Sequence, residues 1–438
     1  MTLSHDLARA RRATAVTFAL VGATSAVWVV RIPALRDKLG LSEAQVGIEV
    51  LAWGLGALAA MQVSTRLMPR FGSHRVLGYS VPASVASLML LAFAPSFPFL
   101  VAGGLVFGSL FGLVDVAANA QASELERACG RPLMGKMHAG WSLGAVLGGA
   151  FGAATAAAGL GFTPSVAMAA ALAVPIALVV APRFHASAPA VQDTEGKGAS
   201  KRLPWVVHLL GALMFCAFLA EGSVADWSSL HLHDTLQVSE AVAALGYPVF
   251  ELAMLLGRLF CDRVTERFGG RLLLGAAGLL AAAGFAVLTF TDRVFVAFAG
   301  LALVGAAVCV VVPLTFSLAG VAGGKRNAQA VARAGMYGYS GLLLGPVAIG
   351  FIAEHHSLRI SFAVVVVTCL LISIGAVRLP DIRIPDKTTG EDGERPSGET
   401  DAPPANADRS PGGGDGATAA VASTGAAASA PTDGGRST

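Results

Sequence analysis

Apolar runs of about 20 residues recur along most of the sequence. Coiled as an α-helix at about 1.5 Å per residue, a run of this length spans a hydrocarbon core of about 30 Å. Composition agrees, because 54% of the 438 residues are hydrophobic and only 13% are charged, against about a quarter charged in soluble domains. The sequence therefore predicts an all-α polytopic membrane protein.

Two series of these runs flank a polar stretch at 182–204. Ser42-Glu43-Ala44 in the first series aligns with Ser239-Glu240-Ala241 in the second, and Phe71-Gly72 aligns with Phe268-Gly269 at the same offset. The repeat predicts two copies of one six-helix unit with the same orientation. We expect twelve transmembrane helices at 13–30, 45–64, 76–94, 97–120, 135–157, 162–181, 205–225, 241–260, 272–290, 294–318, 334–353 and 360–377.

These helices divide the chain into a cytoplasmic N-terminus (1–12), a first six-helix bundle (13–181), a cytoplasmic linker (182–204), a second bundle (205–378) and a tail (379–438). Lys and Arg gather in the segments on the side of the N-terminus and linker, which predicts that both termini are cytoplasmic in a cell membrane. The tail is rich in Gly, Pro, Ala and Asp, so we expect it to be disordered. On the opposite, outer side of the membrane, the segments between helices hold only five Lys and Arg residues: Arg31, Arg36, Lys38, Arg293 and Arg359.

A charged signature follows the predicted eighth helix, and a second copy follows the second helix. It resembles the acid-Arg-x-Gly-x-Arg signature of the major facilitator superfamily, although Pro69 stands where the first copy should hold an acid. The resemblance implies a transporter built from two parallel six-helix repeats. It also implies a cytoplasmic signature loop made of Asp262, Arg263, Glu266, Arg267, Gly269 and Arg271, with Arg70, Gly72 and Arg75 in the first half.

Three further stretches resemble the MosC-like branch of that superfamily. They are the segment 28–33, the segment 115–122 leading to 138–144, and the segment 221–228. The branch is associated with rhizopine, a modified inositol amine. The resemblance, which covers about 13–377, implies a small polar organic solute that is sugar-like, inositol-like or amine-like.

Ionisable residues inside apolar runs are candidates for function, because an isolated charge in hydrocarbon is costly. Glu221 lies well inside the predicted seventh helix, next to Gly222 and Ser223. We expect it to couple transport to protons, with Asp115 and Glu251 as the next candidates. A permanent hydrogen bond to a neighbouring helix is the alternative for Glu221.

Four further residues are candidates for the solute cavity, and two for a gate. Arg31 ends the predicted first helix and Asp226 ends the seventh; in the resembled fold these helices line the cavity, so the two charges could meet when the outer side closes. Two independently solvated helix ends are the alternative. Core packing is the alternative for Trp141, and a membrane-interface belt is the alternative for Trp28. The cavity candidates are Trp28, Asn119, Trp141 and Glu49.

These features predict a secondary active transporter that works by alternating access and is driven by protons. A Walker-type nucleotide-binding motif is absent from the sequence, which argues against direct nucleotide-driven transport. A nucleophile–base set or a metal-ligand spacing is also absent, so we expect no enzyme activity, cofactor, metal or nucleic-acid partner. The expected partners are the lipid bilayer, the solute and protons, and the chain is expected to act as a monomer. The alternatives are a proton-coupled exporter of drugs or metabolites and a non-transporting membrane sensor on the same fold.

Overall fold

Helices make up the regular structure of residues 5–130, 133–186 and 203–380, the part of the chain that the computed structural model describes. All of these residues belong to one unit, Met1–Pro385. The first half holds α1 (His5–Val30), α2 (Ile32–Leu39), α3 (Glu43–Ala92), α4 (Phe97–Cys129), α5 (Met134–Ala157), α6 (Phe162–Val180) and η1 (Ala181–Arg183). The second half holds α7 (Trp205–Leu230), η2 (His231–Thr235), α8 (Glu240–Ala243), α9 (Gly246–Phe268), α10 (Gly270–Phe290), α11 (Val294–Val308), α12 (Val311–Gly323), η3 (Gly324–Arg326), α13 (Asn327–His355) and α14 (Leu358–Val377).

Eleven segments of the described residues are long and apolar enough to cross a membrane. The predicted fifth helix is not among them, but α5 is 24 residues long and occupies the expected place in the order. Its glycines lower its hydropathy without shortening it. The chain is therefore an all-α polytopic membrane protein with twelve transmembrane helices in two parallel repeats of six.

The repeat is visible in local geometry as well as in sequence. Ser42 caps α3 by accepting a hydrogen bond from the backbone of the third helical residue, and Ser239 caps α8 in the same way. Gly72 and Gly269 have φ of 76° and ψ of 156° and 154° respectively. A positive φ is readily adopted only by glycine. The same caps and the same glycine conformation thus recur at equivalent positions of the two halves.

The structure corrects three predicted boundaries. The second and third transmembrane helices are joined without a loop, because α3 runs through and bends only at Gly72. The seventh helix does not end near Asp226 but continues to Leu230 and a π-helical turn. The tenth is divided between α11 and α12 at Cys309 and Val310. Pro313 explains this break, because a proline ring clashes with the carbonyl group four residues earlier.

Glycines bring neighbouring helices of the first half into direct backbone contact. A Cβ atom on Gly144 of α5 would lie 1.9 Å from the carbonyl oxygen of Ala19, and one on Gly148 would lie 2.1 Å from that of Ala23, both on α1. A stripe of glycines spaced four residues apart on α4 packs against α3 in the same manner. Because the hydrophobic effect does not drive helices together within lipid, such close packing is what stabilises the bundle. The stripe consists of Gly104, Gly108 and Gly112.

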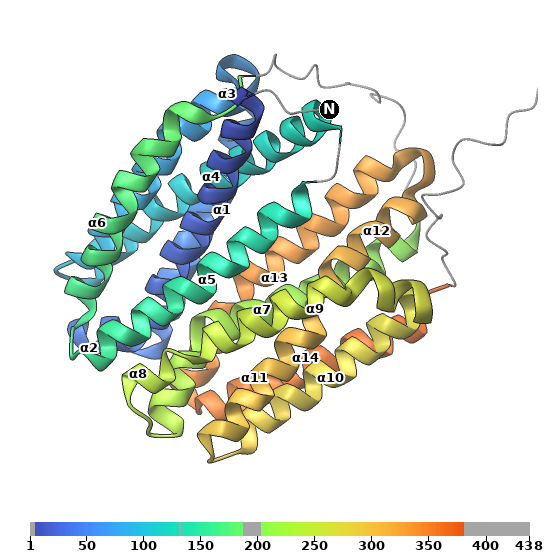
Figure 1. Ribbon diagram of the computed structural model, residues 1–438. Coiled ribbons are helices and arrows are strands. Elements are labelled where there is room, and N and C mark those ends of the chain that lie inside the picture. The colour runs from blue at the N-terminus through green and yellow to red at the C-terminus, as the bar shows by residue number, and fades with distance from the viewer. Residues whose placement is uncertain (1–4, 131–132, 187–202, 381–438) are drawn as a thin grey trace, which may run out of the picture. The chain divides into compact units, whose positions relative to one another are not determined.

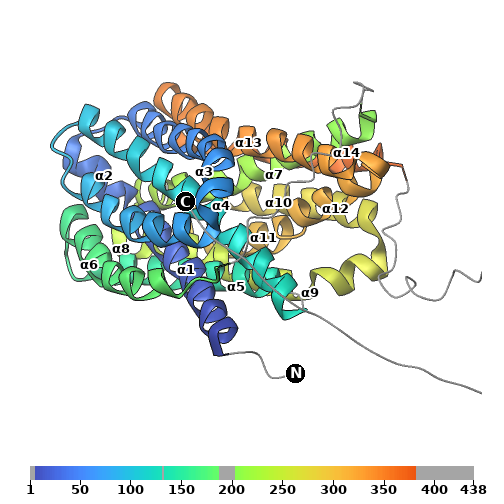
Figure 2. The ribbon, with the colours of Figure 1, turned by 90° about the horizontal axis from the view of Figure 1, so that it is seen from above.

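The two halves lie side by side, with α3, α4 and α6 on one side of Figure 2 and α10, α12 and α14 on the other. Figure 1 shows α2 and α8 close together at the end farther from the N-terminus. We call this end the α2–α8 end. The opposite end, where η1 stops and α7 starts, is called the linker end. The contacts between the halves come from α1, α2, α3 and α5 of the first half and from α7, α8, α9 and α13 of the second.

Candidate functional site

A cluster of acids lies where α7 and α9 meet. Glu221 of α7 is half-buried, and the charges of Arg258 and Glu251, both on α9, act on it. Glu251 is buried and accepts a hydrogen bond from Tyr247 at 2.9 Å, one helical turn earlier on α9. Two of the three candidates for proton coupling, Glu221 and Glu251, are thus neighbours around one arginine. Among the described residues Glu221 forms no hydrogen bond or ion pair.

Arg258 joins this cluster to the other half of the molecule. Its Nη1 donates a long hydrogen bond of 3.4 Å to the hydroxyl of Ser142 on α5. Helices α5 and α9 touch nearby, because a Cβ on Gly149 would lie 2.3 Å from the ring of Pro248. Arg258 lies inside the eighth transmembrane segment, Glu240–Cys261, and within the predicted helix 241–260.

Glu49 and Asp226 bring acids of both halves into one electrostatic group. Both are buried, and the charge of Asp226 on α7 acts on Glu49 of α3. Glu49 packs against α4, since a Cβ on Gly104 would lie 2.7 Å from its Oε1. The charge of Asp226 also acts on Tyr247, and through it this group borders the cluster around Glu221.

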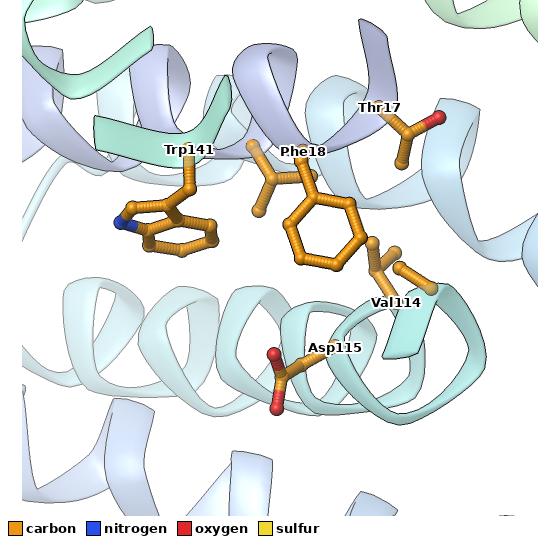
Figure 3. Close-up of a pocket in the computed structure, with 7 residues that line it drawn as sticks. Thr17, Phe18, Val114, Asp115 and Trp141 are labelled. Atoms are coloured by element: carbon orange, nitrogen blue, oxygen red, sulfur yellow. The ribbon is translucent and has the colours of Figure 1, made fainter. Parts of the chain in front are cut away.

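Asp115, the third coupling candidate, lies apart from that cluster and lines a pocket. Its carboxyl accepts a hydrogen bond of 3.1 Å from Asn119. Figure 3 shows the rings of Phe18 and Trp141 on one side of the pocket and Val114 and Asp115 of α4 on the other. Thr17, Val21 and Ala118 complete the lining. An acid beside aromatic faces can hold a cationic or ring-shaped group.

The two tryptophan candidates differ in their surroundings. Trp141 is partly exposed and stands edge-on to Phe111 with 5.8 Å between ring centroids. Trp28 is buried among the core of α1, and its Nε1 has no hydrogen-bond partner in the described structure. Trp141 therefore lines the pocket, whereas Trp28 packs in the protein interior instead of forming a membrane-interface belt.

Two ion pairs connect the halves at the α2–α8 end. Arg31 is fully buried, and its Nη1 lies 2.8 Å from Oε1 of Glu240 on α8. Its Nη2 also donates to the carbonyl of Leu160. Arg36 of α2 pairs with Asp234 of η2. The expected pair of Arg31 with Asp226 is not formed in this conformation, because α7 continues past Asp226 and α8 brings Glu240 to Arg31 instead.

Burial and pairing act differently on these two arginines. Burial lowers the pKa of Arg31, and the charge of Glu240 opposes that effect only in part. Burial also lowers the pKa of Arg36, but hydrogen bonds and the charge of Asp234 outweigh it, so the net pKa is raised. The Arg31–Glu240 pair therefore carries the larger desolvation cost, which makes it sensitive to the loss of its partner.

The signature residues lie where α9 ends and α10 begins. Arg263, Glu266 and Arg267 are exposed on the last turns of α9. Gly269 makes the turn, and Arg271 donates to the carbonyl of Val377 on α14 at 2.5 Å. The side chain of Asp262 lies outside the described residues. In the first half Gly72 is the bend of α3, and Arg70 and Arg75 are exposed on either side of it.

Several residues in these sites are missed by the sequence reasoning. In the sequence, Glu240 belongs to the repeated Ser-Glu-Ala segment and resembles an acid in the first turn of a helix. Arg36 and Asp234 resemble ordinary charged residues of loops. Ser142 lies in the segment 138–144, which the sequence singles out only by its resemblance to the MosC-like branch. Their roles depend on contacts between helices that are distant in sequence. In the part of the chain that is described, no group of three or more His, Cys, Asp or Glu could hold a metal ion.

Known proteins resemble this chain over most of its length. The family model of the Major Facilitator Superfamily matches residues 13–224 and 209–427. An uncharacterized transporter, y4wD, of Sinorhizobium fredii is 33% identical over 83% of this chain and 96% of its own. The membrane protein MosC of Rhizobium meliloti is 30% identical over 83% of this chain and 89% of its own.

Solved structures resemble it in fold. A bacterial homologue of the human lysosomal transporter Spinster, in an inward-facing and occupied conformation, superposes with a TM-score of 0.67 at 16% identity, covering 84% of this chain and 95% of that one. The nucleoside transporter NupG gives a TM-score of 0.66 at 11% identity, covering 84% and 98%. Together with the two matched repeats and the shared caps and bends, these similarities assign the chain to a family. The chain belongs to the Major Facilitator Superfamily and resembles its MosC branch.

Proposed function

We propose that the chain is a proton-driven secondary transporter of a small polar organic solute, and that Glu221 carries the proton. The observation that carries this proposal is the position of Glu221, half-buried in a transmembrane helix without a hydrogen bond or ion pair among the described residues. A buried carboxyl is most easily kept in such a place if it can take up a proton. A permanently bonded structural acid would have a fixed partner.

In this proposal the two halves, 13–181 and 205–378, move relative to each other as rigid bodies during transport. The N-terminus, the linker and the tail lie in the cytoplasm. The ion pairs between the halves lie at the α2–α8 end in the described structure. This supports a conformation that is closed at that end, which is the outer side in the proposed orientation. Solute would then exchange from the linker end.

The pocket around Asp115 and Trp141 supports a solute with a polar or cationic group and a face for aromatic contact. It lies on helices α1, α4 and α5, all of which belong to the first half. The names of the relatives identify no solute for this chain. A panel of labelled sugars, inositols and amines is therefore the appropriate first screen.

Uptake into proteoliposomes, with and without an imposed pH gradient, tests the proposal. The wild-type protein is expected to concentrate at least one solute of the panel only when the gradient is present. Glu221→Gln should abolish that accumulation yet retain exchange of the same solute, because exchange needs no net proton movement. Ser223→Ala is the matched control, since the Ser223 hydroxyl bonds within its own helix to Leu219 at 2.7 Å.

Accumulation by Glu221→Gln with an unchanged dependence on the pH gradient would show that Glu221 is not the proton carrier. Absence of transport for the whole panel, in either direction, would favour the non-transporting sensor. If the pH gradient instead drives a solute from the compartment that represents the cytoplasm to the opposite compartment, the exporter is favoured.

A further inference from the structure

Arg258 has an unexpected partner. Two acids of its own half, Glu221 and Glu251, are close enough for its charge to act on both. Nevertheless, among the described residues its guanidinium forms no ion pair within 4.0 Å, and its one hydrogen bond goes to the neutral hydroxyl of Ser142 in the other half. A carboxylate offers the arginine the attraction of an opposite charge, which a neutral hydroxyl lacks, so the choice of Ser142 needs a cause.

Ser142 is well placed to be that cause. It is fully buried on α5, where that helix faces α9. Its hydroxyl is close enough to Glu251 to act on that carboxyl, whose Oε2 has no hydrogen-bond partner in the described structure, while Tyr247 donates to Glu251 from its own helix. The hydroxyl therefore accepts from the arginine and lies beside the acid. It belongs to the other half, so it remains beside them only while α5 and α9 are together.

We propose that Ser142 is a positioning residue that keeps Arg258 from pairing with Glu221 while the two halves are in contact. Movement of α5 then frees the arginine to pair with Glu221. In the conformation described here Glu221 lacks a cation partner. When α5 moves away, Arg258 loses its bond across the interface and turns to the carboxylate. The opposite charge then stabilises the ionised form of Glu221, which favours release of its proton in that second conformation.

The other charged and titratable groups around Glu221 fit this assignment. From α9 they are Glu251, Tyr247 and Arg258, and from the junction of α11 and α12 Cys309. From α5, His138 interacts with Arg258 one helical turn before Ser142. Arg258 is the only cation among the groups that act on Glu221 in the described structure. Its position therefore controls the balance between the two forms of Glu221.

The inference rests on the proposed role of Glu221, and its test needs no solute. Spin labels at the exposed positions Asp37 and Gln237, in a background where the five native cysteines are replaced by alanine, report the separation of the halves at the α2–α8 end. The distance distribution in proteoliposomes is measured from pH 5 to pH 9. We expect the population of the closed state to change with pH in the wild-type protein, and Glu221→Gln to remove that dependence.

Ser142→Ala should move the midpoint of this pH titration to lower pH by about 0.5–1 unit, because one hydrogen bond that restrains Arg258 is lost. Ser142→Thr keeps the hydroxyl and should restore the wild-type midpoint. Ser223→Ala, equally buried on α7, should not shift it. In an Arg258→Gln background, Ser142→Ala should have no further effect, which a purely structural role for the serine would not produce.

A midpoint unchanged by Ser142→Ala, with Glu221→Gln still removing the pH dependence, would overturn the role of Ser142 and leave the proposed function standing. A shift of the same size in both Arg258 backgrounds would also overturn it. A wild-type distribution that does not respond to pH, or a response that survives in Glu221→Gln, would overturn the proposed proton coupling together with this inference.

Discussion

Loss of the Glu240 carboxylate should open the α2–α8 end. Glu240→Gln leaves Arg31, whose side chain is 0% exposed, without its charged partner, whereas Glu240 itself is 27% exposed. Removing one partner of a fully buried pair destabilises by about 3–5 kcal/mol, and an exposed pair contributes about 0–1 kcal/mol. Arg31 also keeps its contact with Leu160. We therefore expect an intermediate penalty of about 1–3 kcal/mol on the closed conformation, which is a shift of about 5–150-fold in the equilibrium.

The same spin-label pair at Asp37 and Gln237 measures this shift as the ratio of the short-distance to the long-distance population. The control is Asp292→Asn, which breaks the pair between Arg359 and Asp292 within the second half. That pair is exposed and does not join the halves, so the distribution should not change.

Exchange of the two charges provides a second check on the Arg31 contact. Arg31→Glu combined with Glu240→Arg should recover part of the closed population lost in each single variant. An unaltered distribution in Glu240→Gln, or an equal shift in Asp292→Asn, would refute the reasoning that this pair holds the halves together.

Three further outcomes are expected. Gly144→Leu should lower the thermal stability of the purified protein, because its Cβ meets a backbone carbonyl of α1, while Gly135→Leu, which has open space, should not; equal melting temperatures would contradict the packing argument. Gly269→Val and Gly72→Val should both reduce transport, since both glycines have φ of 76° and valine is strained there; a normal transport rate in either variant would argue that transport does not need the bend at that glycine. An accessibility tag inserted in the linker (182–204) should be labelled only from the cytoplasm, and labelling from outside would refute the proposed orientation.

Much of the fold is determined by sequence-local properties. A run of about 20 apolar residues has to form a helix in lipid, since no water is present to satisfy its backbone. The order of the helices and their division into two repeats therefore follow from the chain alone, as do the serine caps at Ser42 and Ser239. The glycine contacts on α4 also follow, because small residues at a spacing of four form one face of a helix.

What only the tertiary structure decided is which charges meet. From the sequence, Arg31 either meets Asp226 across the two halves or is independently solvated, and its actual partner depends on where α7 ends and where α8 begins. Both are set by packing of residues distant in sequence, so the expected Asp226 is replaced by Glu240. In the same way, nothing near Arg258 in the sequence predicts its bond to Ser142. Local propensity and hydropathy act over a few residues, whereas an ion pair or hydrogen bond between helices is fixed only when both helices have packed.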